Sequence, residues 1–599
     1  MSVTSDKRSE EFLKISGQFK LGALVTESSH PATANLSDVA KKDIAAALKL
    51  LFEADGDVIK NFGEFAASRK ADDIKEIILL SLKNGGRIFF TGCGSTGRLS
   101  ILMDSVWRDF WQQQAAHGTL LASDLENRTF SVMAGGDYAL IKSVEGFEDF
   151  TDFGKKQIND LGVSSKDVVF AITEGGETSF VIGTAWAGVE AGAKVYFVYN
   201  NPDDILCEHV QRSREVIQNS RIEKINLTTG PMSITGSTRM QATSIQLCVM
   251  LTILEMVARE LMQEKVDNPP LSSRFLAALE QLHASLKSSE VLTSLAKIVA
   301  LEESVYCAGH KNNYFANRFG IDVLTDTTER SPTYCTPPFR KFDDTTASES
   351  WAFLFLPRSE TPLAWEDILK RSPRCVEWSE TEARNLVGDE KFPRTMETIR
   401  KISRTELTRF KIGLDGLPSR ILKKGDCSVA VVSEAEKDSL FSQDGFFRTQ
   451  LAAAQKADAK TGLIYFGKSA ITTKVADKTV FIPLPKTDFL FDGIARIAIK
   501  LVMNALSTCT MVRLGRVMGN TMIWVVPSNL KLIDRATRYI SRLSDLDYAP
   551  ANRLLFDVIE YVEPRMKSDR AYPPVVGMAV LRAKENLSNE EAEKKLNAF

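Results

Sequence analysis

The feature that most constrains this chain is a short apolar strand that runs into a glycine-rich turn and then into a helix. Residues 87–90 (RIFF) are predicted to be the strand, 91–98 read TGCGSTGR, and a helical pattern covers 99–111. This succession is typical of α/β proteins, where the turn lies at the carboxyl edge of a parallel sheet. Glycine lets backbone N–H groups approach an anion, hydroxyls add donors, and the helix start adds about half a positive charge. The turn therefore predicts a phosphate site at Gly94, Ser95, Thr96 and Gly97.

The same turn also fits the G-x-G-x-x-G pattern of dinucleotide-binding proteins. That pattern requires an acidic residue at the end of the second strand, about 20 residues further on. The next segment with strand character, Phe130–Met133, ends in Ala134-Gly135-Gly136-Asp137, which is too distant and too rich in glycine to hold a ribose. A phosphate site is favoured over a nicotinamide site, and a tight turn with solvent-facing hydroxyls is the structural alternative.

A second loop and an acidic segment extend the candidate site. The loop 173–179 (TEGGETS) follows a predicted strand and offers the hydroxyls of Thr173 and Thr178. Two such loops at the carboxyl ends of parallel strands can converge on one ligand. The segment 144–149 (VEGFED) supplies Glu148, whose carboxylate could bind a sugar hydroxyl or move a proton. An ordinary glycine turn and a solvated acidic helix start are the alternatives.

The chain is predicted to contain two related α/β domains. Strands are expected at 167–173, 194–200 and 224–227, followed by a long helix over 237–263. A weaker copy of this plan follows, with strands at 304–309, 427–433, 461–467 and 479–485 and a helix over 491–514, but without the glycines of the first turn. Residues 515–599 are predicted to form short helices. Strands that alternate with helices predict mainly parallel sheets.

Composition excludes several classes of function. The 599 residues carry a formal net charge of −2, which does not favour nucleic acid or an anionic membrane surface. The eight cysteines are scattered without a CxxC pair, which is typical of reduced thiols in a cytoplasmic protein and argues against zinc. We see no apolar signal core and no uninterrupted apolar run of about 20 residues, so no membrane span is expected.

Five motifs in their order resemble sugar isomerase (SIS) domains: the glycine–hydroxyl turn, AGGDY, VEGFED, ITEGGET and TGSTRM. The resemblance is to the branch that contains the N-acetylmuramic acid 6-phosphate etherases and the glucokinase regulatory protein. It implies two flavodoxin-like SIS domains, with parallel sheets flanked by helices, and a small helical C-terminal cap. The implied limits are an N-terminal segment at 1–40, a first SIS domain at 41–275, a second and degenerate SIS domain at 276–510, and the cap at 511–599.

The resemblance also implies roles for individual residues. Ser95, Thr96, Thr173 and Thr178 match hydroxyls that bind phosphate. Glu148 matches a glutamate of the etherases that is also a sugar contact in the regulatory protein, and Lys500 matches a lysine that reaches the ligand from the second half. Four positions depart from the pattern. Val106 replaces the other acid/base glutamate of the etherases, Gln241 replaces a lysine, Met232 replaces a glutamate, and Gly175 replaces a serine.

The sequence therefore predicts a sugar-phosphate-binding protein that needs no cofactor or metal. The first interpretation is a non-catalytic sensor that could control a sugar kinase. The alternative is a sugar-phosphate lyase of the etherase type, or an aldose–ketose isomerase, that uses Glu148. Valine at position 106 can neither accept nor donate a proton, so the sequence does not decide whether the protein is an enzyme.

Overall fold

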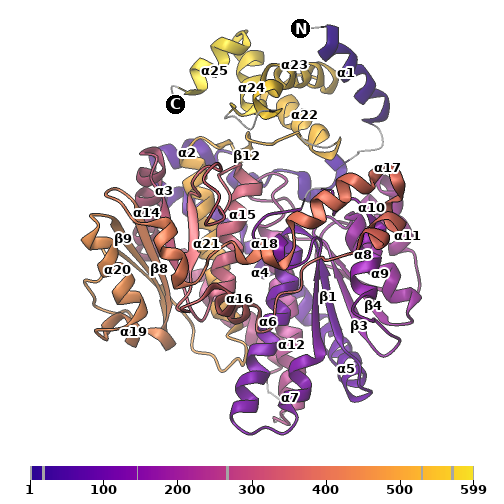
Figure 1. Ribbon diagram of the computed structural model, residues 1–599, viewed down its shortest axis with the longest axis vertical. Coiled ribbons are helices and arrows are strands. Elements are labelled where there is room, and N and C mark those ends of the chain that lie inside the picture. Colours follow the sequence, from indigo (N-terminus) through magenta and orange to yellow (C-terminus); the bar gives the residue numbers. More distant parts are fainter. Residues whose placement is uncertain are drawn as a thin grey trace.

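The computed structural model describes residues 3–16, 21–144, 146–264, 269–527, 530–567 and 572–597. It contains two five-stranded parallel sheets, each flanked by helices (Figure 1). The first sheet has the order β2-β1-β3-β4-β5 and the second the order β10-β9-β8-β6-β7. Counted within each domain, both sheets therefore have the flavodoxin-like order 2-1-3-4-5. The predicted α/β fold with two SIS domains is confirmed.

Four strands of the first sheet are almost wholly buried, as expected for a parallel sheet with helices over both faces, and the edge strand β5 is partly exposed. They are β1 (Ile88–Gly92), β2 (Thr129–Met133), β3 (Val168–Ile172), β4 (Lys194–Tyr199) and β5 (Ile222–Asn226). Helix α6 (Gly94–Ala116) packs on β1 and β2, and helix α9 (Ser179–Glu190) packs on β3 and β4. Because β1 pairs with both β2 and β3, the turns after β1 and β3 lie side by side at the carboxyl edge.

The second sheet consists of β6 (Asn312–Phe315), β7 (Ala352–Phe355), β8 (Cys427–Ser433), β9 (Lys460–Gly467) and β10 (Lys478–Pro483). Helix α15 (Gly320–Tyr334) follows β6, and α21 (Gly493–Arg513) follows the sheet. Helices α15 and α21 contact each other, and they also contact α6 and α12 (Gln241–Leu261) of the first half respectively. These four helices form the junction between the two halves, where the candidate site lies.

One predicted strand is wrong. Residues 304–309 do not form a strand, because Ser304–Cys307 are the last turn of α14 (Ser289–Cys307), and the strand β6 begins only at Asn312. The buried side chains Leu295, Ile298, Val299, Val305 and Tyr306 follow helical spacing, which continues through the segment. A short apolar run has no periodicity of its own, so the preceding helix decides its conformation. The predicted strands after residue 400 match β8, β9 and β10.

A helical cap follows the second domain, as the sequence predicts. It consists of a β11–β12 hairpin (Val517–Met518 and Thr521–Met522) and helices α22 (Leu530–Ser544), α23 (Tyr548–Lys567), α24 (Val575–Glu585) and α25 (Asn589–Asn597). Helix α1 (Val3–Ile15) lies against α23, with Phe12 beside Phe556 and Arg8 Nη1 3.0 Å from Glu563 Oε2 (Figure 1). The limits of the N-terminal segment, the two SIS domains and the cap stay predictions.

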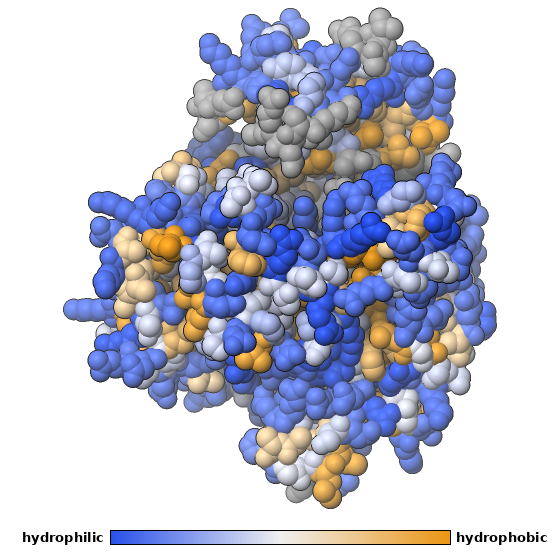
Figure 2. Space-filling model, in the orientation of Figure 1, coloured by the Kyte–Doolittle hydropathy of each residue, from blue (hydrophilic) through white to orange (hydrophobic). Residues whose placement is uncertain are grey.

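The remaining α-helices of the described residues are α2 (Leu36–Lys42), α3 (Ile44–Ala54), α4 (Gly56–Ala67), α5 (Lys70–Lys83), α7 (Ala122–Leu125), α8 (Thr151–Asn159), α10 (Asp203–His209), α11 (Gln211–Ile217), α13 (Leu271–Leu286), α16 (Thr361–Leu369), α17 (Glu380–Lys401), α18 (Arg404–Thr408), α19 (Asp438–Phe441) and α20 (Phe446–Lys456). By length and composition, α12 and α21 could cross a membrane. Both are almost wholly buried inside the protein, as the core helices of soluble proteins are. Figure 2 shows a mostly hydrophilic face, with apolar atoms gathered at the lower tip near α7, where Leu120 and Leu121 are exposed.

Candidate functional site

The turn between β1 and α6 presents its backbone at the carboxyl edge of the first sheet. Cys93 is the N-cap of α6, and Gly94 adopts φ +54, a left-handed conformation that favours glycine. A Cβ on Gly94 would meet nothing within 4 Å, so the backbone there is open to a ligand. Gly97 has a different role, because its Cβ would lie 2.5 Å from Met133 Cγ. Gly97 therefore allows α6 to pack closely on β2.

The two hydroxyls of the turn differ in what they contact. Thr96 Oγ1 accepts a hydrogen bond from Cys93 N (3.1 Å) and donates one to Cys93 O (2.9 Å), which is an N-terminal cap of α6. Ser95 Oγ has no hydrogen-bond partner among the described residues, and Ser95 lines a cavity between the two halves. The structure therefore leaves the Ser95 hydroxyl available to a ligand and engages the Thr96 hydroxyl in the fold.

This difference predicts unequal effects of the two substitutions on stability. Thr96→Ala is expected to lower the free energy of unfolding by about 1 kcal/mol, because it removes a helix cap. Ser95→Ala is expected to change it by less than about 0.5 kcal/mol, because no bond within the protein is lost. Urea unfolding of both variants measures the two values, and an equal loss in both would contradict the assignment.

The loop after β3 lies beside this turn. Thr173 Oγ1 and Thr178 Oγ1 are 3.1 Å apart, and Gly176 N donates to Thr173 Oγ1 (3.3 Å). Gln246 Nε2 donates to Thr173 O (3.1 Å) and fixes the loop against α12. The two predicted hydroxyls therefore contact each other, at the edge where the turn after β1 also ends.

Glu148 is placed at the same turn. Cys93 Sγ donates to Glu148 Oε2 at 3.6 Å, and Phe180 N donates to Glu148 O (3.0 Å), which anchors the backbone of the acidic segment. The carboxylate is half-buried. Glu145, from the same motif, lies outside the described residues. Glu148 thus reaches the turn between β1 and α6, although it is not among the residues that line the cavity between the halves.

Lys500 enters the site from the second half. It lies on α21 and lines the same cavity as Ser95. Its Nζ donates to Arg239 O (2.8 Å). Burial and, to a smaller extent, the positive charge of Arg239 lower the pKa of Lys500 to about 8. An anionic ligand would stabilise this buried ammonium, so a cation placed here favours a phosphorylated molecule.

Two arginines of the cavity were not among the predicted site residues. Arg98 and Arg239 are 0 % and 3 % exposed, and within the described part of the chain Arg98 Nη2 and Arg239 Nε have no hydrogen-bond partner. Their other nitrogens pair with Glu329 and Asp326 of α15. Arg98 belongs to the glycine–hydroxyl turn and Arg239 to the TGSTRM motif, both of which the sequence singles out. Their acidic partners lie in α15, where no sequence motif indicated a site. The complete lining is Ser95, Arg98, Leu99, Leu102, Arg239, Thr243, Leu247, Asp322, Thr325, Asp326, Glu329, Lys500 and Asn504.

The cap holds the turn that carries Arg239. Tyr539 OH donates to Thr235 O (2.6 Å), and Thr235 N donates to Asn520 O (2.9 Å). Asn520 Nδ2 also donates to His30 O (3.2 Å), so the N-terminal segment, the first domain and the cap meet at this residue. The position of Arg239 therefore depends on all three parts of the chain.

Gln241, one of the departures, has a structural role. Its Nε2 donates to Asp55 Oδ1 (3.0 Å), and its Oε1 accepts from Ser233 N (2.9 Å). Burial raises the pKa of Asp55 to about 7, a value that the hydrogen bond from Gln241 and the charge of Lys500 limit. Gln241 is thus a neutral donor to a buried carboxyl.

Neither aspartate of α6 can take over the proton transfer that Val106 cannot perform. Asp104 Oδ1 accepts from Arg108 Nε (2.8 Å), and its Oδ2 accepts from Arg371 Nε (3.0 Å). Burial alone would raise the pKa of Asp104, but Arg371, Arg374 and Arg108 hold it well below its usual range. Asp109 pairs with Lys370 Nζ at 3.0 Å. Both carboxylates are therefore engaged in ion pairs.

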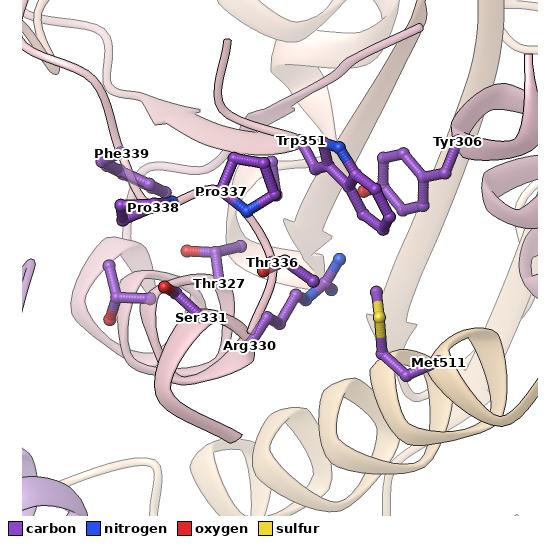
Figure 3. Close-up of a pocket in the computed structure, with 12 residues that line it drawn as sticks. Tyr306, Thr327, Arg330, Ser331, Thr336, Pro337, Pro338, Phe339, Trp351 and Met511 are labelled. Carbon is purple, nitrogen blue, oxygen red and sulfur yellow. The ribbon is translucent and has the colours of Figure 1, made fainter. Parts of the chain in front are cut away.

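A second cavity lies between α14, α15 and the segment before β7, apart from all predicted site residues. Figure 3 shows Trp351 facing Tyr306, with their ring centroids 5.1 Å apart, near Arg330 and Met511. Arg330 is already paired with Glu302 and Asp326. Among the residues that the structure describes, no group of three or more His, Cys, Asp or Glu could hold a metal ion.

Comparison with known proteins gives consistent results for the first half. A family model described as the glucokinase regulatory protein N-terminal SIS domain matches residues 71–187. The N-acetylmuramic acid 6-phosphate etherase of Clostridioides difficile (strain 630) is 31% identical over 239 residues, which are 39% of this chain and 69% of the relative. The N-acetylmuramic acid 6-phosphate etherase of Aliivibrio fischeri (strain MJ11) is 31% identical over 232 residues, which are 38% of this chain and 68% of the relative. The tagatose-6-phosphate ketose/aldose isomerase of Escherichia coli aligns with a TM-score of 0.44 and 11% identity, covering 84% of this chain and 100% of that one.

Proposed function

The chain belongs to the family of SIS-domain proteins that contains the N-acetylmuramic acid 6-phosphate etherases, and from this premise we propose that it binds a phosphorylated sugar between its two halves. The observation that carries the proposal is that Ser95 and Lys500, which lie in different halves, line one cavity. The open backbone at Gly94, the Ser95 hydroxyl and the start of α6 hold the phosphoryl group. Lys500 adds a positive charge to the same cavity from the second half.

The reaction that we propose is cleavage of a carbon–oxygen bond, as in the relatives named etherases. Glu148 takes the proton from the carbon next to the one that bears the ether oxygen, and the resulting electron pair expels that oxygen. The leaving oxygen then needs a proton. Lys500 is the donor that we propose, because its pKa of about 8 lets an ammonium act near neutral pH. Asp104 and Asp109 are engaged elsewhere, and Val106 has no proton to give.

The non-catalytic sensor is the second candidate, although relatives with an enzymatic name do not favour it. One observation supports it: Val106, buried in α6, stands where the resemblance places a catalytic glutamate. In that case ligand binding between the halves would bias an open–closed equilibrium. A sugar kinase as the controlled partner and a cytoplasmic location belong to this proposal.

Incubation with N-acetylmuramic acid 6-phosphate, together with calorimetric titration, tests both candidates. Release of lactate supports the etherase. Saturable binding of that compound or of a hexose 6-phosphate, without lactate, supports the sensor. If neither molecule binds, the proposed site is wrong.

The charge of Lys500 predicts how affinity depends on pH. Above pH 8 the ammonium of the free protein loses its proton, so affinity for the phosphorylated sugar is expected to fall by up to about tenfold per pH unit. Lys500→Met is expected to weaken binding at least about tenfold at pH 7 and to remove the decline above pH 8. Titrations between pH 6.5 and about pH 9.5 measure this, with the exposed Lys478→Met as control. An unchanged pH profile in Lys500→Met would contradict the role of Lys500.

A further inference from the structure

The second domain contains the same two structural positions that form the candidate site in the first. Its sheet has the same strand order, so the turn from β6 to α15 corresponds to the turn from β1 to α6. In the same way, the end of β8 corresponds to the end of β3. In the first domain these positions carry Gly94, Ser95, Thr173 and Thr178. What fills the corresponding place in the second domain decides whether it can bind a ligand of its own.

A carboxylate of the chain itself lies there. Glu436 Oε1 accepts a hydrogen bond from Arg318 N (2.9 Å), in the turn from β6 to α15. Glu436 Oε2 accepts from Ser433 N (3.1 Å) and Ser433 Oγ (2.6 Å), at the end of β8. One carboxylate thus collects two backbone N–H groups and a hydroxyl from both positions. These are the donors that bind oxyanions at the edges of parallel sheets.

The surroundings of Glu436 are unfavourable for an added phosphate. Asp492 pairs with the Arg318 guanidinium, and Glu434 Oε2 accepts from Lys468 N (2.9 Å). Burial lowers the pKa of the Arg318 guanidinium, but the carboxylates of Asp492, Asp109 and Glu436 raise it, so one cation here already serves three acidic groups. A phosphate dianion would be repelled and would have to displace a group that is already hydrogen-bonded.

We propose that Glu436 is the resident anion of the second domain and occupies the place that the phosphoryl group of the ligand takes in the first. It thereby fastens the start of α15 to the end of β8. Helix α15 carries Asp322, Asp326 and Glu329, which line the cavity between the halves. The second domain is held by its own carboxylate, and each chain takes one sugar phosphate. The comparison with the phosphoryl group rests on the proposed function, whereas the anion site itself does not.

Replacement of the carboxylate tests the proposal without any sugar. In Glu436→Ala the three donors lose their partner, and a small oxyanion can take its place. Acetate or formate is expected to raise the Tm of this variant by at least about 2 °C more than chloride of equal ionic strength. The wild-type protein is expected to show no such difference, because the position is filled.

Glu591→Ala is the matched control. Glu591 belongs to another Ser-x-x-Glu capping box, with Ser588 N donating to Glu591 Oε2 (2.8 Å), but no N–H from a second strand turn reaches it in the described residues. If Glu436 served only as a helix cap, both variants would respond to anions alike, and that result would overturn the proposal.

If Glu436→Ala does not accumulate in folded form, refolding in acetate and in chloride replaces the melting experiment. Recovery of folded protein in acetate but not in chloride supports an anion site. No recovery in either salt, or equal recovery in both salts, overturns the proposal. Because these readouts use no sugar phosphate, failure of this proposal is distinguishable from failure of the proposed function.

Discussion

Glu148→Gln is expected to slow the release of lactate from N-acetylmuramic acid 6-phosphate by about 10²–10⁴-fold, while affinity changes by only a few-fold. Glutamine has nearly the same shape and can still accept the hydrogen bond from Cys93 Sγ. An amide, however, cannot take a proton from carbon. Single-turnover kinetics at saturating substrate measures the chemical step apart from binding.

Asp149→Asn is the control for this experiment. Asp149 is the exposed neighbour of Glu148, and its substitution removes the same charge as Glu148→Gln does. Its rate is expected to stay within about twofold of wild type, since surface substitutions have small effects. Equal rates in Glu148→Gln and wild type would show that another group takes the proton. A wild type that binds but releases no lactate would favour the sensor.

Arg371→Met is expected to lower the free energy of unfolding by about 3–5 kcal/mol. Arg371 comes from the second half, is 6% exposed, and donates to Asp104 Oδ2 (3.0 Å) and Asp137 Oδ2 (2.6 Å) of the first half. Methionine fills a similar volume, but it leaves Asp137 without this cation and leaves Asp104 with Arg108 and Arg374 as cationic partners. The cost is large because the remaining carboxylates are buried.

The effect of Arg371→Met should depend on pH in a defined direction. The pKa of Asp104 is lowered in the folded protein, so its ion pairs contribute stability above the unfolded pKa, near 4, and this contribution is lost as pH falls. The difference in the free energy of unfolding between Arg371→Met and wild type is therefore expected to shrink below about pH 4. Denaturant unfolding across pH measures it, with Arg400→Met, an arginine whose side chain is 68% exposed, as control. A difference that persists at low pH would indicate that packing, and not charge, is lost.

The parts of the site that the sequence predicted are those built from neighbouring residues. The strand, turn and helix at 87–111 are local, and the strand order brings Thr173 beside Cys93. The cavity between the halves could not be predicted from periodicity, because Arg98 meets Glu329 across 231 positions of the chain. The different roles of Ser95 and Thr96 also depend on how the helix is capped, which their shared hydroxyl chemistry does not reveal.

The weaker match of the second half has a physical reason. Residues 316–319 of its turn from β6 to α15 contain no glycine, and there Glu436 of the chain itself accepts a hydrogen bond from a backbone N–H. The strand expected at 304–309 was wrong because the helix before it extends through those residues. Lys500, in contrast, was predicted from the family resemblance alone, because nothing in its local sequence marks a lysine of an apolar helix as a binding residue.

The pairing of α1 with α23 has a consequence for how the molecule is made on the ribosome. Helix α1 is synthesised long before its partners Asn552, Phe556 and Glu563, since Ser9 and Asn552 are 543 positions apart and Arg8 and Glu563 are 555 apart. Domains fold during synthesis from the N-terminus onward, so both SIS domains can form while α1 waits without its partner. The Tyr539 contact to the turn of Arg239 forms after both SIS domains, so nascent chains are expected to gain ligand affinity only once the cap has left the ribosome.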